Sequence, residues 1–458
     1  ARGCFFARRQ KTSRVLIEKT AALCYYIVVN PTKIRSLPHA PRAVQVTKHM
    51  ANLKLAGVSK IYPSGKMALF NVSFSSSDSE FIAVVGGASC GKSTLLRIIA
   101  GLEEATAGDI YIGDKLSNEL EPKERDVAMV FGSNTLYPSL SVADNIAFGL
   151  KMRNVPQAVV QQRVKVAAEI LGLTDVLYRK PKALTSSQRL LATYGRAIVR
   201  EPKIYLLDDP LAGLDGKLRD EMRNVLINLQ ARVKGTFVYA TKNISEAMSM
   251  ATRIVVLKEG FVQQVDTPRN LYDYPANAYV GFFVGSPTMN FIGRATVERG
   301  EDGVYCVFDD KKLKVPENIL ARWQNVEEYI GTGKQVTLGI RPEDIAVDAD
   351  VCDLEGTVCG ADTEDGRSLA EIDVSKNYSL TVFLEKPEKG ATHKLKIDLS
   401  HLYVFDYETQ LTVLSRDEGY VADEKNSEAD FVPLTKGETE ERIKQFTPPE
   451  PAKNKKRR

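Results

Sequence analysis

Short apolar runs alternate with amphipathic stretches over the first half of the chain, from Leu53 to about Phe283. Continuous apolar runs that end at Gly or Asp are typical of buried strands, and apolar residues three or four apart are typical of surface helices. Four runs have the first pattern: FIAVVGG (Phe81 to Gly87), KIYLLDD (Lys203 to Asp209), TFVYAT (Thr236 to Thr241) and RIVVLKEG (Arg253 to Gly260). Their alternation with helical stretches predicts an α/β fold with a parallel sheet covered by helices.

The spacing of apolar residues changes twice along the chain. The stretch VVQQRVKVAAEILGL suits an amphipathic helix and predicts a helical subdomain inserted at about residues 135–190. After GSPTMNF (Gly285 to Phe291), short strands separated by Gly and Asp turns predict a small all-β domain. We therefore expect four parts: an extension (1–49), an α/β domain (50–284), a β domain (285–414) and a tail (415–458) too charged to fold alone.

Length and composition indicate a multidomain protein without a membrane span of its own. The chain has 458 residues, 43% of them hydrophobic, which suffices for two or three cores. The run AALCYYIVV is about half of the roughly 20 apolar residues that a spanning helix needs, so we expect membrane contact only through partners. The six cysteines form no CxxC pair, which argues against a disulfide framework or a zinc site.

The net charge of +4 conceals a strongly basic leader. Residues 1–49 carry ten Lys and Arg against one acid, Glu18, so the rest of the chain is mildly acidic. A basic leader before a candidate second start at Met50 is typical of an organelle presequence. The other interpretations are a flexible basic arm without contacts and a retained arm held against a protein partner. We expect an organellar location, mitochondrial rather than plastid, and no nucleic-acid partner.

The segment GGASCGKST (Gly86 to Thr94) matches the pattern G-x-x-x-x-G-K-[ST] between a predicted strand and a helical run. In that context the loop N–H groups point at phosphate oxygens, Lys92 neutralises the β- and γ-phosphates, and Ser93 offers a hydroxyl to Mg²⁺. The acidic end of YLLDD supplies Asp208 as a second group for the Mg²⁺ shell. Together the two motifs predict a site for ATP or ADP with Mg²⁺.

Further motifs occur in order over about residues 51–414: VAMVFGSNTLYPSLSVADNIAFGLKMR, RKPKALTSSQR, GRAIVREPKIYLLDDPLAGLD, ISEAMSMATRIVVLKEG and LGIRPEDI. This set resembles the ABC-transporter ATPases, in the branch that powers import of maltose, other sugars or glycerol phosphate. The resemblance implies a RecA-like nucleotide-binding core, a helical subdomain that docks on membrane subunits and a C-terminal OB-like regulatory domain. It also implies that two copies close head to tail over two ATP molecules.

The resemblance implies roles for individual residues as well. Tyr62 would stack on adenine, and Ser93 and Asp208 would hold Mg²⁺. The phosphate-binding residues would be Gly86, Ser89, Cys90, Gly91, Lys92, Ser93 and Thr94.

Several catalytic positions depart from the family pattern. Gly132 replaces a glutamine, Asp209 replaces the glutamate that acts as general base, and Lys242 replaces the switch histidine. The signature Leu-Ser-Gly-Gly-Gln is here Leu184 followed by Thr185, Ser186, Ser187 and Gln188. Ser89 stands where the family has glycine. The four histidines are His39, His49, His393 and His401, so none between residues 50 and 392 can replace the switch.

These departures predict that nucleotide binding is kept and hydrolysis is slow. A positioned general base contributes about 10²- to 10⁴-fold in rate. If Ser89 needs a positive φ, we expect a cost of about 1–2 kcal/mol and binding weakened roughly tenfold. The main hypothesis is a hydrolysis-deficient structural subunit of a larger organellar assembly. The alternative is a working importer subunit, active through a composite site with a partner, and a third hypothesis is a metabolite sensor that uses the β domain.

Overall fold

The computed structural model describes residues 52–132, 136–364 and 366–417. The predicted extension at 1–49, all of the predicted tail from residue 418 on, and the candidate start at Met50 lie outside these residues. Within the described ranges no helix is both long and apolar enough to cross a membrane.

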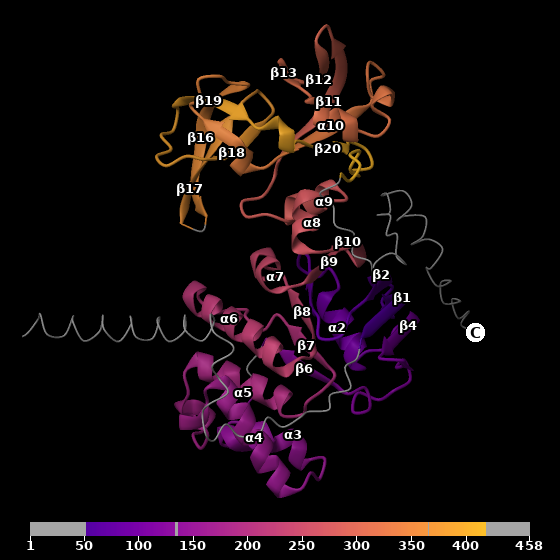
Figure 1. The fold of residues 1–458 in the computed structure, drawn as a ribbon, viewed down its shortest axis with the longest axis vertical. Helices are drawn as coiled ribbons and strands as arrows, with labels where there is room; N and C mark the ends of the chain where they lie inside the picture. Colours follow the sequence, from indigo (N-terminus) through magenta and orange to yellow (C-terminus); the bar gives the residue numbers. More distant parts are fainter. Residues whose placement is uncertain (1–51, 133–135, 365, 418–458) are drawn as a thin grey trace, which may run out of the picture. The chain divides into compact units, whose positions relative to one another are not determined.

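A mostly parallel sheet forms the centre of the first domain, with the strand order β10-β9-β3-β8-β7-β6 (Figure 1). Its strands are β3 (Phe81–Val85), β6 (Val127–Phe131), β7 (Ile204–Asp208), β8 (Thr236–Thr241), β9 (Arg253–Lys258) and β10 (Phe261–Asp266). Only β10 runs antiparallel to its neighbour among the described strands of this sheet. The four buried strands expected from the apolar runs are therefore confirmed.

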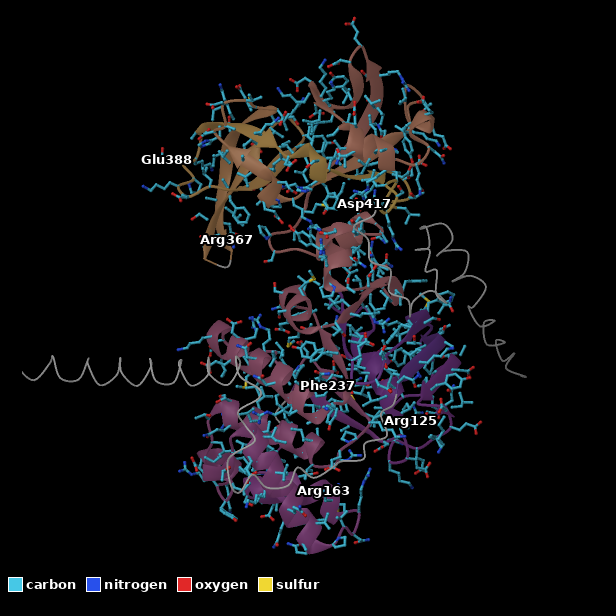
Figure 2. The ribbon with its side chains drawn as sticks, in the orientation of Figure 1. Arg125, Arg163, Phe237, Arg367, Glu388 and Asp417 are labelled. Carbon is cyan, nitrogen blue, oxygen red and sulfur yellow. The ribbon has the colours of Figure 1, made fainter. Side chains whose placement is uncertain are left out.

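Side chains of this sheet are apolar on both faces, as continuous apolar runs require. On β8, Phe237 packs with the helical core on one face, and Val238 packs with the core around α2 (Lys92–Ala100) on the other. Phe237, which Figure 2 labels, stacks on Phe81 and Tyr205 with ring centroids 5.6 and 4.6 Å apart. Side chains of β3, β7 and β8 thus enter apolar cores on both faces of the sheet, which holds the ends of these strands in place.

An antiparallel sheet with the order β2-β1-β4-β5 packs on the α2 side of the core. Its strands are β1 (Leu53–Ile61), β2 (Met67–Ser75), β4 (Ala107–Ile112) and β5 (Lys115–Leu116). Arg125 is buried here and donates to the carbonyls of Ile98, Leu120 and Asn118 at 2.7, 2.9 and 3.0 Å (labelled in Figure 2). It thereby satisfies a carbonyl in the last turn of α2, where intrahelical donors run out.

Three helices between β6 and β7 pack side by side (Figure 1). They are α3 (Val142–Lys151), α4 (Gln157–Leu171) and α5 (Ser186–Ile198). The amphipathic stretch expected to form a helix corresponds to α4, which buries Val160, Val164 and Leu171. The remaining helices of this half are α6 (Gly216–Val233), α7 (Ile244–Met250), α8 (Pro268–Asp273) and α9 (Ala278–Phe283).

Beyond residue 285 the chain is built mainly of antiparallel strands in two sheets, β13-β12-β11-β14-β20 and β15-β19-β16-β17-β18. The first contains β11 (Asn290–Gly300), β12 (Gly303–Phe308), β13 (Lys311–Lys314), β14 (Gln335–Ile340) and β20 (Tyr403–Asp406). The second contains β15 (Ile345–Val347), β16 (Leu354–Glu364), β17 (Arg367–Asp373), β18 (Ser379–Phe383) and β19 (Thr392–Ile397). One apolar core joins the two sheets, and the short helix α10 (Glu317–Arg322) contributes Ile319 to it.

Candidate nucleotide-binding site

The Gly86 to Thr94 loop joins the end of β3 to the first turn of α2. Gly91, just before the helix, has φ 103°, and a Cβ on it would lie 2.5 Å from the Ala68 carbonyl oxygen. Only glycine fits this close approach, which holds the loop against β2. The N–H groups at the start of α2 have no intrahelical acceptors, so this helix end suits an anion.

The ammonium group of Lys92 lies over the loop. It donates to the carbonyls of Gly86 and Gly87 at 2.8 and 2.7 Å, and it lies 3.3 Å from the Cys90 sulfur. The group is half-buried, and its positive charge acts on the nearby Asp209 carboxyl and is available to an anionic ligand. A phosphate at the helix end would lie within reach of this lysine.

A hydroxyl and a carboxylate meet beside the loop. Ser93 donates its Oγ proton to Asp208 Oδ1 at 2.8 Å, which joins the first turn of α2 to the end of β7. Oxygen ligands of this kind, few in number and completed by water and phosphate, are what Mg²⁺ prefers. The two residues therefore fit the cation that accompanies ATP.

Tyr62 follows β1 and lies next to the loop. Its hydroxyl donates to Glu103 Oε2 at 2.8 Å and is 3.3 Å from Thr94 Oγ1. The structure thus places Tyr62, the candidate for stacking on adenine, beside Thr94, the last residue of the phosphate-loop motif.

Ser89 has φ 58°, so the condition set from the sequence, a positive φ at this position, is met. A positive φ at a residue with a Cβ strains the backbone of the folded chain, so we expect it to lower the free energy of unfolding. A glycine variant at this position tests whether the cost appears in stability or in the tenfold loss of affinity expected above.

Replacing Ser89 by glycine (S89G) is expected to stabilise the fold by about 1 kcal/mol, because glycine adopts positive φ without strain and the added freedom of the unfolded chain offsets part of the gain. Thermal unfolding checks this, and ATP affinity should change by less than about threefold. A88G is the control, since the neighbouring Ala88 has no positive φ. A weaker S89G fold, or a tenfold gain in affinity, would contradict the assignment.

Three of the altered catalytic positions come together at neighbouring strand ends. Gly132 follows β6, Asp209 follows β7 and Lys242 follows β8, and these strands are adjacent and parallel. Burial raises the pKa of the Asp209 carboxyl, and the positive charge of Lys242 opposes that rise. An acid and an ammonium group therefore share the edge of the sheet where Asp208 also lies, hydrogen-bonded to Ser93.

The segment Thr185 to Gln188 forms the N-terminus of α5. Thr185 Oγ1 accepts from the Gln188 N–H at 3.2 Å, and Gln188 Oε1 accepts from the Thr185 N–H at 3.1 Å. The pattern T-x-x-Q is thus a capping box, a signal present in the sequence that the functional interpretation passed over. The Ser187 hydroxyl hydrogen-bonds to the Thr185 hydroxyl, and the Ser186 hydroxyl accepts from Arg189. Within the described residues, none of these side-chain hydrogen bonds reaches the phosphate loop.

A buried carboxylate behind the site was not predicted. Glu246 on α7 accepts from the hydroxyls of Tyr239 and Thr241 at 2.6 and 2.9 Å, and its other oxygen lies 3.6 Å from Arg219 Nε. Arg219 in turn donates to the Leu214 carbonyl at 2.9 Å. The cluster ties the segment that follows Asp209 to the end of β8. Its burial depends on helix packing, which local sequence does not reveal.

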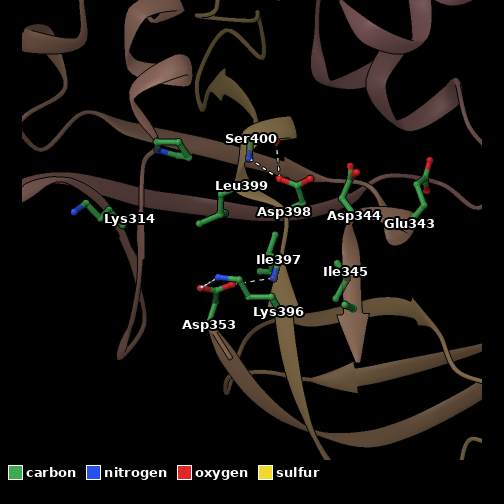
Figure 3. Close-up of a pocket in the computed structure, with 12 residues that line it drawn as sticks. Lys314, Glu343, Asp344, Ile345, Asp353, Lys396, Ile397, Asp398, Leu399 and Ser400 are labelled. Carbon is green, nitrogen blue, oxygen red and sulfur yellow. Dashed lines mark hydrogen bonds and ion pairs between the residues drawn. The ribbon is translucent and has the colours of Figure 1, made fainter. Parts of the chain in front are cut away.

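The β part contains a separate open pocket of about 750 Å³ (Figure 3). The two lysines among its lining residues are already paired, Lys396 with Asp353 at 3.1 Å and Lys314 with Asp302 at 2.9 Å. Burial raises the pKa of both Glu343 and Asp344 on its rim. This pairing gives an anionic metabolite little to bind, and the metabolite-sensor hypothesis gains no support from this pocket.

The sequence matches two known families. Residues 69–212 match the ABC transporter family, and residues 285–345 match the MalK OB fold domain. The first match includes the phosphate loop, the start of α5 and the acids at the end of β7. The expected fold class, a P-loop α/β core with a C-terminal OB-type domain, is confirmed.

Three relatives show how far the similarity extends. The oligosaccharides import ATP-binding protein MsmX of Bacillus subtilis is 47% identical over 297 residues, which cover 65% of this chain and 79% of the relative. The uncharacterized ABC transporter ATP-binding protein YcjV of Escherichia coli is 41% identical over 368 residues, 80% of this chain and 100% of the relative. The sn-glycerol-3-phosphate import ATP-binding protein UgpC of Burkholderia thailandensis is 39% identical over 370 residues, 78% and 98%.

These comparisons correct one prediction. The relatives are bacterial ATP-binding proteins, two of them named for import, so the expected organellar location is wrong. The prediction rested on the composition of residues 1–49, which lie outside the described structure, and a basic composition alone does not identify a targeting signal. With the whole of YcjV covered at 41% identity, the chain belongs to the ABC transporter ATP-binding proteins that carry a MalK-type OB fold domain.

Proposed function

We propose that this chain is the ATP-binding subunit of an importer for a sugar or glycerol phosphate, and that it binds ATP with Mg²⁺. One observation carries the proposal: the Lys92 ammonium lies over the phosphate loop, and the adjacent Ser93 hydroxyl donates to Asp208 at the end of β7. The names of two relatives, MsmX and UgpC, of which the matches cover 79% and 98%, support the solute class. Membrane subunits are the expected partners, because the chain would reach the membrane only through them.

The altered positions lead us to propose slow turnover for this subunit alone. Asp209 keeps the acid of the general base but is one methylene shorter than glutamate, which matters where reacting atoms must lie within about 3–3.5 Å. Lys242 cannot accept a proton as a neutral imidazole does. A composite site, in which a second and more complete ABC subunit closes on this one, would restore the missing groups.

A second candidate is a nucleotide-binding subunit that does not hydrolyse ATP. It is favoured by the loss of side chain at Gly132 and by Ser186 and Ser187, whose side chains stand where the family has only backbone. These groups act as a unit in catalysis, so their combined loss is not simply the product of single losses.

Steady-state ATP hydrolysis separates the two candidates. The purified chain is assayed alone and after co-expression with importer membrane subunits in vesicles. Turnover on the order of 1 s⁻¹ or more in the assembled vesicles supports the importer subunit. Stoichiometric ATP binding without turnover in either preparation supports the second candidate, and absence of ATP binding contradicts both.

Replacing Asp208 by asparagine (D208N) is expected to remove most of the Mg²⁺ dependence of ATP binding. The variant keeps the hydrogen-bond geometry with Ser93 but loses the negative charge that holds the cation. ATP affinity is measured by calorimetry with Mg²⁺ and with a chelator. The wild type should bind at least about tenfold tighter with Mg²⁺, and the ratio in D208N should approach one.

The matched control for this experiment is D215N. Asp215 caps α6 through the Leu218 N–H at the far end of the loop that follows Asp208, so D215N should keep the wild-type Mg²⁺ ratio. An unchanged ratio in D208N would remove Asp208 from the proposed cation site.

A further inference from the structure

Gly132 and Asp209 lie side by side, because Phe131 and Asp208 pair at the ends of the parallel strands β6 and β7. We infer that Gly132 is a positioning residue for Asp209: the space left by its missing side chain is occupied by the Asp209 backbone carbonyl, which fixes where the Asp209 carboxylate stands. The role of this contact in ATP hydrolysis rests on the proposed function. The contact between Gly132 and the Asp209 carbonyl rests on the geometry alone.

The space at Gly132 is closed to any side chain. A Cβ on this residue would lie 2.5 Å from the Asp209 carbonyl oxygen and 3.3 Å from that of Asp208. Even a favourable carbon–oxygen contact is about 3.3–3.6 Å long. Both atoms belong to the backbone, so neither can rotate away as the end of a flexible side chain would.

The backbone of Asp209 is anchored in this position from both sides. Its N–H donates to the Ala240 carbonyl of β8 at 2.8 Å, and its carbonyl accepts from the Ala212 N–H at 3.1 Å. Asp209 has φ 47°, in the left-handed region. To move the carbonyl away from Gly132, the chain would have to give up a hydrogen bond or change this conformation.

The residue types at the two positions suit each other. Aspartate tolerates left-handed backbone better than glutamate, because its short side chain can bond to nearby backbone. Aspartate at 209 adopts this conformation at a lower cost than glutamate, although Glu201 and Glu259 of this chain also have φ 50°, and glycine at 132 accommodates the carbonyl. The two departures from the family pattern are therefore one coupled structural change rather than two independent losses.

The coupling is tested by a cycle of thermal unfolding midpoints without nucleotide, using G132A, D209G and the double variant. G132A is expected to lower the midpoint by roughly 4–8 °C. D209G allows the carbonyl at position 209 to turn away. Adding G132A to D209G should therefore lower the unfolding midpoint by less than about a third of the fall that G132A causes alone. G216A is the control, since a Cβ on Gly216 meets nothing within 4 Å and should leave the midpoint within about 2 °C.

Losses that add in the double variant overturn the inference, because a general packing role of Gly132 would not be relieved by a change at 209. A G132A midpoint equal to that of the wild type overturns it as well. The cycle needs no nucleotide, so it tests the coupling even in a protein that does not bind ATP. Failure to bind ATP would contradict the proposed function alone.

Hydrolysis provides the catalytic readout, with ATP affinity measured in the same samples. G132Q and D209E alone should not raise turnover, and G132Q/D209E should raise it at least about tenfold, because glutamate favours release of the left-handed backbone. G132Q alone matching the double variant would overturn the inference, since position 132 would then accept a side chain beside Asp209. A double variant no faster than wild type, with ATP binding intact, would overturn the positioning role.

Discussion

Replacing Lys92 by alanine (K92A) is expected to weaken ATP binding by about 100- to 1000-fold. A hydrogen bond to a charged group contributes about 1.5–3 kcal/mol, and the ammonium can reach two phosphates, which gives roughly 3–6 kcal/mol; the expected loss of affinity corresponds to the lower part of this range. The group is half-buried over the loop and donates to the Gly86 and Gly87 carbonyls, and the nearby Asp209 carboxyl offsets part of this attraction beforehand. Equilibrium binding of a fluorescent ATP analogue measures the loss.

Two further variants make the K92A result specific. K92R keeps the charge but places a planar fork where one ammonium now bridges the Gly86 and Gly87 carbonyls, so an intermediate loss is expected. K151A removes a lysine paired with Asp144 on α3 and should bind ATP like the wild type. K92A binding within about threefold of the wild type, with an intact fold, would remove the phosphate role of Lys92.

The strands and the phosphate loop could be predicted because their signals are local. The strands β3, β7, β8 and β9 are continuous apolar runs. The phosphate loop has a fixed order of glycine, lysine and hydroxyl residues just before and within the first turn of α2. For Ser89 the sequence raised a positive φ only as a condition, and the structure supplies the value of 58°. Such features are decided within about ten residues of chain.

The remaining features depend on contacts between distant segments. The approach of Gly132 to the Asp209 carbonyl follows from the pairing of β6 with β7, and the burial of Glu246 follows from the packing of α6 on α7. From the sequence, Gly132 and Asp209 looked like separate losses of function. Only the register of the strands shows that the two positions touch.

Replacing Glu80 by alanine (E80A) is expected to destabilise the first domain by about 3–5 kcal/mol, the usual cost of breaking a buried ion pair from one side. Glu80 is 9% exposed and Arg253 4% exposed, and Arg253 donates to Glu80 through Nε and Nη2 at 2.6 and 3.0 Å. Glu80 also accepts from the Ser77 N–H at 2.6 Å. Alanine would leave the arginine charge buried without this carboxylate, at the start of β3 and β9.

Hydrogen exchange of the β3 and β9 amides reports this loss directly, which matters because a multidomain chain need not unfold in one step. E121A is the matched control: Glu121 pairs with Lys123 at 2.6 Å, but the two side chains are 64% and 72% exposed, so no measurable change is expected. E80Q, which keeps the shape and part of the hydrogen bonding, should fall between the two. If E80A exchanged as slowly as E121A, the pair would not hold the two strands together. The end of β3, where the phosphate loop begins, and the end of β7, which carries Asp208, would then owe their rigidity to the apolar cores alone.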